Sequence, residues 1–321
     1  MPDLMIEARD LRMTFKARTG PVEAVKGINL AVHEGESFGF LGPNGAGKTT
    51  TLRMFATLLR PSAGQVTIAG VDLLAEPQKV RERIGYVGQG KGSDGAMTGR
   101  GELVYQGRFF GLSKAAAETR AAELLSAFDL ADAADRKSST YSGGMRRRLD
   151  VAMGMVHQPP LLFLDEPTTG LDPQARARMW DEVLKLRNAG TTVFLTTHYL
   201  DEADALCDRI AIIDHGQIVA LGTPDELKRQ IGGDVVTLGV PEASRQAAHD
   251  LVAAQGFVRK AAIEDGVIRL YVEAGDAAVP QLLRTLDAAG IAVTTISFNR
   301  PSLNDVFLQQ TGRSLRDEPG A

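Results

Sequence analysis

The sequence has few cysteines: among its 321 residues, Cys207 is the only one. A single thiol cannot form a disulfide within the chain, which suits a reducing cytosol. We interpret Cys207 as a partly buried helix residue with no chemistry of its own.

Long apolar runs are also missing. No segment reaches the roughly 18 consecutive apolar residues that a membrane helix needs. The uncharged stretch 151–164 is too short and contains two prolines. The first ten residues, MPDLMIEARD, include acidic residues and lack the basic and apolar regions of a signal peptide. We therefore expect a cytoplasmic chain that does not span a membrane by itself and needs a partner for any membrane role.

The sequence has no strong excess of charge of either sign. Its net charge of −4 gives no reason to expect a nucleic acid partner. A hydrophobic content of 44% and a charged content of 24% are those of an ordinary soluble globular protein. A chain of 321 residues is longer than most single domains, so one large domain and one smaller domain are expected.

The most informative stretch is FLGPNGAGKTTTL, residues 40–52, which matches the spacing G-x-x-x-x-G-K-[ST]. Its glycines let successive backbone amides turn toward one anion. Lys48 can reach the β and γ phosphates of a nucleotide, and the Thr49 hydroxyl suits Mg²⁺. A strand-to-helix turn without a ligand is the alternative, but the order strand, loop, Lys-Thr and helix argues against it. The predicted nucleotide-binding residues are Gly42, Asn44, Gly45, Ala46, Gly47, Lys48, Thr49 and Thr50.

Kinases, GTPases, helicases and transport ATPases all use such a loop, so the loop alone does not identify the class of enzyme. The carboxylates that follow a second strand must distinguish these classes. The apolar run 161–164 is of the buried-strand type and ends at Asp165 and Glu166. Asp165 can hold the Mg²⁺ shell beside Thr49. Glu166 can orient the attacking water and accept its proton, an effect typically of ~10²–10⁴ in rate. Adjacent acids after a strand are otherwise mostly surface carboxylates, but the phosphate loop earlier in the chain makes that reading weaker.

Two further polar side chains end predicted strands. His198 follows the apolar strand 192–195 and would reach the γ-phosphate as a hydrogen-bond donor. A lone histidine is usually structural, and His33, His157, His215 and His249 receive no role. Gln89 follows the strand 84–87, where its amide could contact both the metal's water and a neighbouring element. Three consecutive arginines, 146–148, are interpreted as a solvated helix face without a catalytic role.

Residues 5–15 and 24–32 alternate apolar and polar positions and are expected to form antiparallel strands. Phe15 is placed in the loop after the first strand, where an exposed aromatic could stack on a nucleotide base. A core phenylalanine is the alternative.

Alternating strands and helices around the phosphate loop predict a parallel sheet covered on both faces. From residue 232 the predicted order becomes βαββαβ, typical of a split-βαβ domain, and the chain ends in a polar tail that we expect to be disordered. The predicted division is a nucleotide-binding domain at 1–225, with a helical subdomain at about 90–160, and a regulatory or assembly domain at 226–321.

The motifs GPNGAGKTT, Gln89, YSGGM, LLFLDEP, GLD and TTH occur in this order over roughly residues 5–225. In this arrangement the chain resembles an ATP-binding subunit of an ABC transporter. The resemblance implies an α/β fold of the P-loop NTPase, ABC ATPase type, with a parallel core sheet, an antiparallel β subdomain and an α-helical subdomain, followed here by a small α+β domain. It also implies hydrolysis of ATP with Mg²⁺.

The family resemblance further implies a head-to-tail homodimer in which each ATP lies between the phosphate loop of one copy and the signature segment of the other. Ser142 and the amides of Gly143 and Gly144, at a helix N-terminus, would form the second anion site. Asp172 would lie at the interface.

The sequence departs from the usual family pattern at three places. Phe15 stands where tyrosine is commonest, and Tyr141 and Met145 replace the leucine and glutamine of the common signature. The loop after Gln89 is unusually rich in glycine, and this loop is where the coupling helix of a membrane partner should dock.

The segments YSGGMRRRLD, TGRGELVYQGRFFGL and ISFNRPSLNDVFLQQTGR resemble the daunorubicin and doxorubicin resistance branch of ABC exporters. This narrower resemblance implies a separate ABC-2 type permease, a peripheral position on the inner face of the cell membrane, and export of a hydrophobic drug or antibiotic. The alternative is a soluble ABC ATPase that acts on ribosomes or DNA, but the first type usually has two cassettes and the second a long coiled coil. A GTPase is weaker still, since no NKxD motif occurs.

Overall fold

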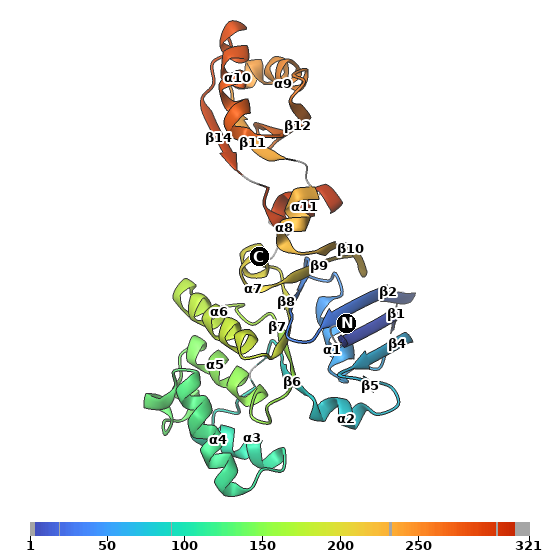
Figure 1. Cartoon of the computed structure of the whole chain (residues 1–321), viewed down its shortest axis with the longest axis vertical. Coiled ribbons are helices and arrows are strands. Elements are labelled where there is room, and N and C mark those ends of the chain that lie inside the picture. The colour runs from blue at the N-terminus through green and yellow to red at the C-terminus, as the bar shows by residue number, and fades with distance from the viewer. Residues whose placement is uncertain (1–3, 19, 91, 231–232, 300, 312–321) are drawn as a thin grey trace. The chain divides into compact units, whose positions relative to one another are not determined.

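The computed structural model describes residues 4–18, 20–90, 92–230, 233–299 and 301–311 (Figure 1). The chain divides into two compact units, of which the first ends at Leu221 and the second begins at Gly222. The tail expected to be disordered, residues 312–321, lies outside the described residues.

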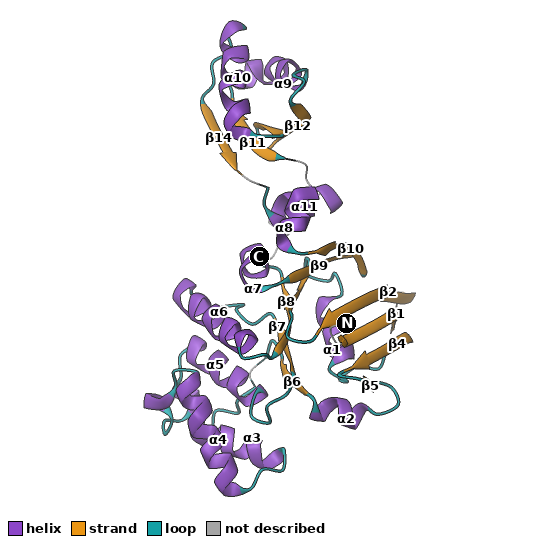
Figure 2. Cartoon of the chain, viewed as in Figure 1, coloured by secondary structure: helices purple, strands orange, loops and turns teal. Residues whose placement is uncertain are grey.

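The core of the first unit is a six-stranded sheet in the order β10-β9-β3-β8-β7-β6. Neighbouring strands from β9 to β6 run parallel, and every residue of β3, β7 and β8 is buried, because helices cover both faces. Figure 2 shows helix α1 on one face and helices α5 and α6 on the other. The strands are β3 (Ser37–Leu41), β6 (Ile84–Val87), β7 (Leu161–Asp165), β8 (Thr192–Thr197), β9 (Arg209–Asp214) and β10 (Gln217–Gly222), and the helices are α1 (Lys48–Phe55), α5 (Gly143–Gly154), α6 (Pro173–Asn188) and α7 (Leu200–Leu206).

A second, antiparallel sheet has the order β2-β1-β4-β5 and shares its apolar core with α1 and the central sheet. Its strands are β1 (Leu4–Ala17), β2 (Gly20–His33), β4 (Ala63–Ile68) and β5 (Val71–Asp72), and α2 (Pro77–Glu82) follows. The predicted loop position of Phe15 is wrong. The pairing of β1 with β2 continues to Ala17 opposite Gly20, so Phe15 lies within β1 opposite Val22.

Helices α3 (Gly99–Phe109) and α4 (Lys114–Ala127), followed by the short helices η1 (Ala131–Ala133) and η2 (Ser138–Thr140), form the helical part of the first unit. Thr98 and Ser113 cap α3 and α4, since each side-chain oxygen accepts a hydrogen bond from a backbone amide of the first turn. The chain turns between the two helices at Gly111, which has a φ of 85°.

The second unit contains a four-stranded antiparallel sheet in the order β12-β13-β11-β14. Helices α9 and α10 bury their apolar faces against one side of it. The last strand starts at Thr295 rather than at Ile291, because the Ile291 amide donates to the Leu286 carbonyl and closes helix α10. The elements are α8 (Pro224–Gln230), β11 (Asp234–Gly239), η3 (Glu242–Ser244), α9 (Arg245–Ala253), β12 (Val258–Glu264), β13 (Val267–Val272), α10 (Gly275–Ala288), β14 (Thr295–Asn299) and α11 (Leu303–Thr311).

Over the described ranges the longest helix is α6, with 16 residues. No helix there is long and apolar enough to cross a membrane.

Candidate functional site

The phosphate loop joins the end of β3 to the start of α1, as its sequence predicts. Two of its glycines are required by close backbone approaches. A Cβ atom on Gly42 would lie 2.2 Å from the Ile213 carbonyl oxygen, and one on Gly47, whose φ is 106°, would lie 2.6 Å from the Ala24 carbonyl oxygen. Asn44 and Gly45 remain exposed at the tip of the loop. The loop is therefore held at both ends while its tip is open to solvent.

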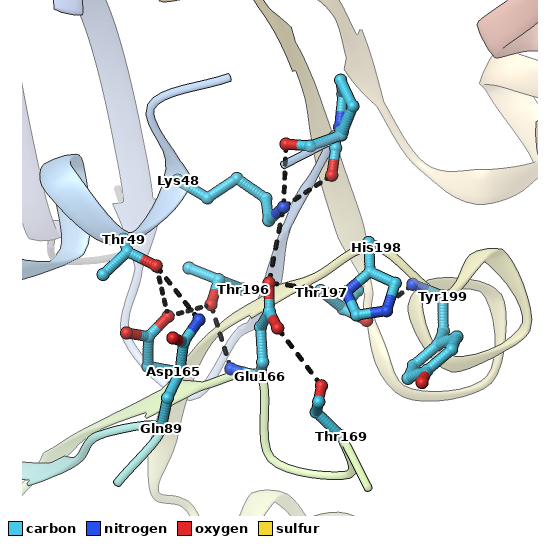
Figure 3. A network of polar contacts seen from close by, with 12 residues as sticks. Lys48, Thr49, Gln89, Asp165, Glu166, Thr169, Thr196, Thr197, His198 and Tyr199 are labelled. Atoms are coloured by element: carbon cyan, nitrogen blue, oxygen red, sulfur yellow. Dashed lines mark hydrogen bonds and ion pairs between the residues drawn. The ribbon is translucent and has the colours of Figure 1, made fainter. Parts of the chain in front are cut away.

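The side chain of Lys48 is buried under this loop and points back toward it (Figure 3). Its Nζ donates to the Gly42 carbonyl at 2.6 Å and to the Pro43 carbonyl at 3.0 Å, and it lies 3.5 Å from Glu166 Oε1. The ammonium is therefore surrounded by carbonyl and carboxylate oxygens, and a phosphate would offer it oxygens of the same kind. A bound phosphate would therefore compete with Glu166 for Lys48.

Asp165 is fully buried at the end of β7. Its Oδ1 accepts hydrogen bonds from Thr196 Oγ1 at 2.7 Å and from Thr49 Oγ1 at 3.0 Å, and Gln89 Nε2 donates to the same Thr49 hydroxyl at 3.3 Å. The other carboxylate oxygen, Oδ2, has no hydrogen-bond partner within the described part of the chain. A buried carboxylate oxygen without a partner among the described residues, next to the Thr49 hydroxyl and the Gln89 amide group, fits a hard cation such as Mg²⁺.

Glu166 adopts a left-handed backbone with a φ of 46°, which is uncommon for a residue other than glycine. Its amide donates to the backbone and side-chain oxygens of Thr196, both at 3.1 Å. Its carboxylate lies 3.4 Å from His198 Nδ1 and accepts a hydrogen bond from Thr169 Oγ1 at 3.2 Å. The strained backbone is thus fixed by β8, and it points the carboxylate at Lys48 and His198.

The charge state of Glu166 follows from these neighbours. Burial acts to raise the pKa of its carboxyl, but the His198 ring and the Lys48 ammonium outweigh burial, so the pKa lies below the ordinary glutamate value. Glu166 is therefore ionised at neutral pH and can accept a proton.

The signature segment begins helix α5. Ser142 caps it by accepting a hydrogen bond from the Met145 amide at 3.2 Å, and Ser142 and Gly143 are exposed. Asp172 caps α6 in the same way, accepting from the Ala175 amide at 2.8 Å. Ser142, Gly144 and Asp172 line one cavity, so two helix N-termini, with their partial positive charge, meet there.

The unusual Tyr141 anchors this segment. It is buried, and its hydroxyl donates to the Ala133 carbonyl at 2.7 Å. A side chain on Gly99 would collide with this hydroxyl, since its Cβ would lie 2.1 Å away. The tyrosine therefore ties the signature to the helical part of the unit.

The solvated-face interpretation of the three arginines is wrong. Arg147 and Arg148 are 9% and 6% exposed, and Arg146 is half-buried, because α5 packs against both the helical part and the core sheet. Sequence reasoning also missed the roles of Thr169 and Thr196 in the polar network. Thr196 could have been found, since it lies near the end of the strand next to β7, opposite Asp165.

The sole tryptophan contacts the helix that follows His198. Trp180 on α6 donates its indole N–H to the buried carboxylate of Glu202 at 3.2 Å, and Glu202 lies on α7, directly after the turn that holds His198. Burial raises the pKa of Glu202. Cys207 directly follows α7, where it is buried against Gly39, and burial raises the pKa of its thiol.

The chain resembles known proteins over most of its length. The ABC transporter family matches residues 25–169, and the C-terminal domain family of DrrA1-3-like ATP-binding proteins matches residues 222–311. The daunorubicin/doxorubicin resistance ATP-binding protein DrrA of Streptomyces peucetius is 48% identical over 92% of this chain and 89% of its own. The linearmycin resistance ATP-binding protein LnrL of Bacillus subtilis is 35% identical over 98% of this chain and 100% of its own.

Solved structures agree. A dimeric ATP-binding cassette in a post-hydrolysis state, bound to ADP and Pi, superposes with a TM-score of 0.63 and 27% identity over 68% of this chain and 98% of its own. The predicted fold class and family are confirmed: the chain belongs to the ABC transporter family of ATP-binding proteins and is an ATP hydrolase of that type.

Proposed function

We propose that two copies of this chain close head to tail on ATP and drive a separate ABC-2 type permease, working at the cytoplasmic face of the cell membrane. The observation that carries this proposal is the presence of two anion-binding ends in one chain. The phosphate loop is joined to the acids Asp165 and Glu166, whereas the N-terminus of α5 carries Ser142 in a cavity with Asp172. A chain that binds one ATP at its phosphate loop has no use for a second γ-phosphate site unless that site faces the phosphate loop of another copy. The dimeric relative bound to ADP and Pi supports this arrangement.

Within each ATP site, Thr49, Asp165 and Gln89 would hold Mg²⁺, to which the unpartnered Asp165 oxygen is suited. The cation would neutralise charge on the β and γ phosphates. The γ-phosphate would draw Lys48 away from Glu166 and leave that carboxylate free to orient water and take its proton. His198, next to Glu166, would donate to the γ-phosphate, and Phe15 would stack on the base.

A groove beside the glutamine loop, the segment 88–93 that contains Gln89, suits a helix of the permease. Gly88, Gly90 and Gly92 line it together with apolar side chains. Two of these, Phe109 and Leu58, are 75% and 59% exposed. Exposed apolar side chains next to a catalytic loop support docking of a partner whose movement reaches the ATP site.

The cargo is proposed to be a hydrophobic drug or antibiotic. Two relatives support this class, since one is named for resistance to daunorubicin and doxorubicin and the other for resistance to linearmycin.

The test is Ser142→Arg in cells that express the chain together with the proposed ABC-2 type permease. Because Ser142 is exposed at the proposed interface, the arginine would obstruct the partner's γ-phosphate. We expect drug efflux and ATP turnover to fall at least about thirtyfold, with ATP affinity of the monomer within about threefold of the unchanged chain.

The matched control is Ser113→Arg, a change at the cap of α4, which should leave turnover within about threefold. Weakened ATP binding to the Ser142→Arg monomer would refute the cross-subunit assignment. Turnover without efflux of any hydrophobic compound would refute the export assignment.

A further inference from the structure

Arg147, on α5, donates hydrogen bonds to the backbones of two other segments, one after β6 and one at the end of β7. Its Nη1 donates to the Gly88 carbonyl at 2.6 Å, at the start of the glutamine loop. Its Nε donates to the Pro167 carbonyl at 2.9 Å, and its Nη2 to the Asp165 carbonyl at 3.0 Å, with the Glu166 carbonyl at 3.5 Å. One guanidinium thus holds the backbone of both catalytic acids and the residue before Gln89.

The same helix holds the far end of the glutamine loop one turn later. The buried carboxylate of Asp150 accepts a hydrogen bond from the Ser93 amide at 3.0 Å. The loop comes so close that a Cβ on Gly92 would lie 2.9 Å from Asp150 Oδ1. The segment that contains Gln89 is therefore fastened to α5 at both of its ends.

A buried arginine is a costly way to obtain stability. Burial lowers the pKa of Arg147, although Asp150 and Asp165 oppose that effect. An apolar side chain of similar size often stabilises such a position as well or better, so the arginine here is better explained by a need for defined geometry than by stability. Its planar fork can satisfy several carbonyls at fixed angles, which the single ammonium of a lysine cannot.

We propose that Arg147 is a positioning residue that keeps the signature helix, the glutamine loop and the backbone of Asp165 and Glu166 in one rigid frame. This inference rests on the proposed function in that Glu166 acts on water. Through Arg147, the position of Ser142 at the partner's ATP and the position of Glu166 at the chain's own ATP depend on each other. Arg147 acts through the positions of Glu166 and Gln89.

Arg147→Lys tests this proposal in the full-length chain, with Arg120→Lys as the matched control. Arg120 also donates hydrogen bonds from its guanidinium to backbone carbonyls, those of Met155 at 3.0 Å and Val156 at 3.3 Å. These two residues follow the C-terminal end of α5, whereas the signature segment is at its N-terminal end. Since misplacing a catalytic group by about 1 Å can cost about a hundredfold in rate, we expect Arg147→Lys to lower kcat at least about thirtyfold. ATP affinity should stay within about threefold, and Arg120→Lys should keep both quantities within about threefold.

A second variant separates positioning from folding. Arg147→Ala leaves a space the size of a guanidinium group, so low concentrations of guanidinium chloride should raise the turnover of this variant at least about tenfold. Glu166→Gln should show no such recovery. Thermal melting of each variant identifies the folded fraction to which turnover is normalised.

Equal turnover of Arg147→Lys and Arg120→Lys would overturn the proposal, as would a loss of ATP affinity with kcat unchanged. An Arg147→Ala variant that does not respond to guanidinium while Arg147→Lys keeps its turnover would also overturn it. If Glu166→Gln itself retains turnover, the proposed function fails, whatever the result at Arg147.

Discussion

The sheets of the two units differ in strand direction, and this difference determines where chemistry can gather. In the first unit, strands β3, β6, β7 and β8 run parallel, and each is followed directly by a polar segment: the phosphate loop, Gln89, Glu166 and His198. In the second unit all strand pairs are antiparallel, so the carboxyl ends of strands that are neighbours in the sheet fall on opposite edges. Within its described residues, no comparable polar network connects strand ends. Parallel strands collect functional groups at one edge, and antiparallel strands disperse them.

Among the variants that test this comparison, Glu166→Gln is expected to have the largest effect. The amide keeps the shape of the side chain but cannot accept the proton of water, so ATP turnover should fall at least about a hundredfold. ATP binding should persist, and an ATP-bound dimer should accumulate, as seen by light scattering.

Asp214 provides the control for Glu166, because it is another acid at the end of a parallel strand, outside the polar network of Figure 3. Asp214→Asn should keep turnover within about threefold. Comparable losses in the two variants would break the link between the strand-end network and catalysis.

An intermediate effect is expected for Phe15→Ala, which tests an exception to the comparison. Phe15 is 39% exposed on the antiparallel strand β1, and base stacking on an aromatic ring contributes about 1–3 kcal/mol. The dissociation constant for a fluorescent ATP analogue should rise about tenfold, and Phe15→Trp should restore it.

Phe298, 45% exposed on β14 of the second unit, is the matched position for Phe15. Phe298→Ala should leave ATP affinity unchanged. If Phe15→Ala also leaves ATP affinity unchanged, the nucleotide base does not stack on the antiparallel sheet.

The smallest effect is expected from ending the chain after Gly222. The second unit has an apolar core of its own, so its removal should leave ATP affinity within about threefold, as measured by calorimetry. A truncated chain that does not melt cooperatively, or that does not bind ATP, would show that the units are not independent domains.

The strand-end groups could be predicted because a buried apolar run identifies a parallel strand, and its next residue must lie at the sheet edge. Asp165, Glu166 and His198 were found in this way. Arg147 could not be found, since three successive arginines do not indicate which of them the neighbouring elements bury. The position of Phe15 failed for a related reason: the length of a hairpin strand depends on its partner's register, which local alternation does not determine.

The hydrogen bond between Trp180 and Glu202 gives the molecule a built-in optical probe. Trp180 is the only tryptophan, so its emission can be assigned without labelling. Its indole N–H is bound to a carboxylate on α7, the helix that starts two residues after His198. A displacement of that helix would change the polarity sensed by the ring, so stopped-flow fluorescence of the unmodified protein could time any movement of α7 within the ATP cycle.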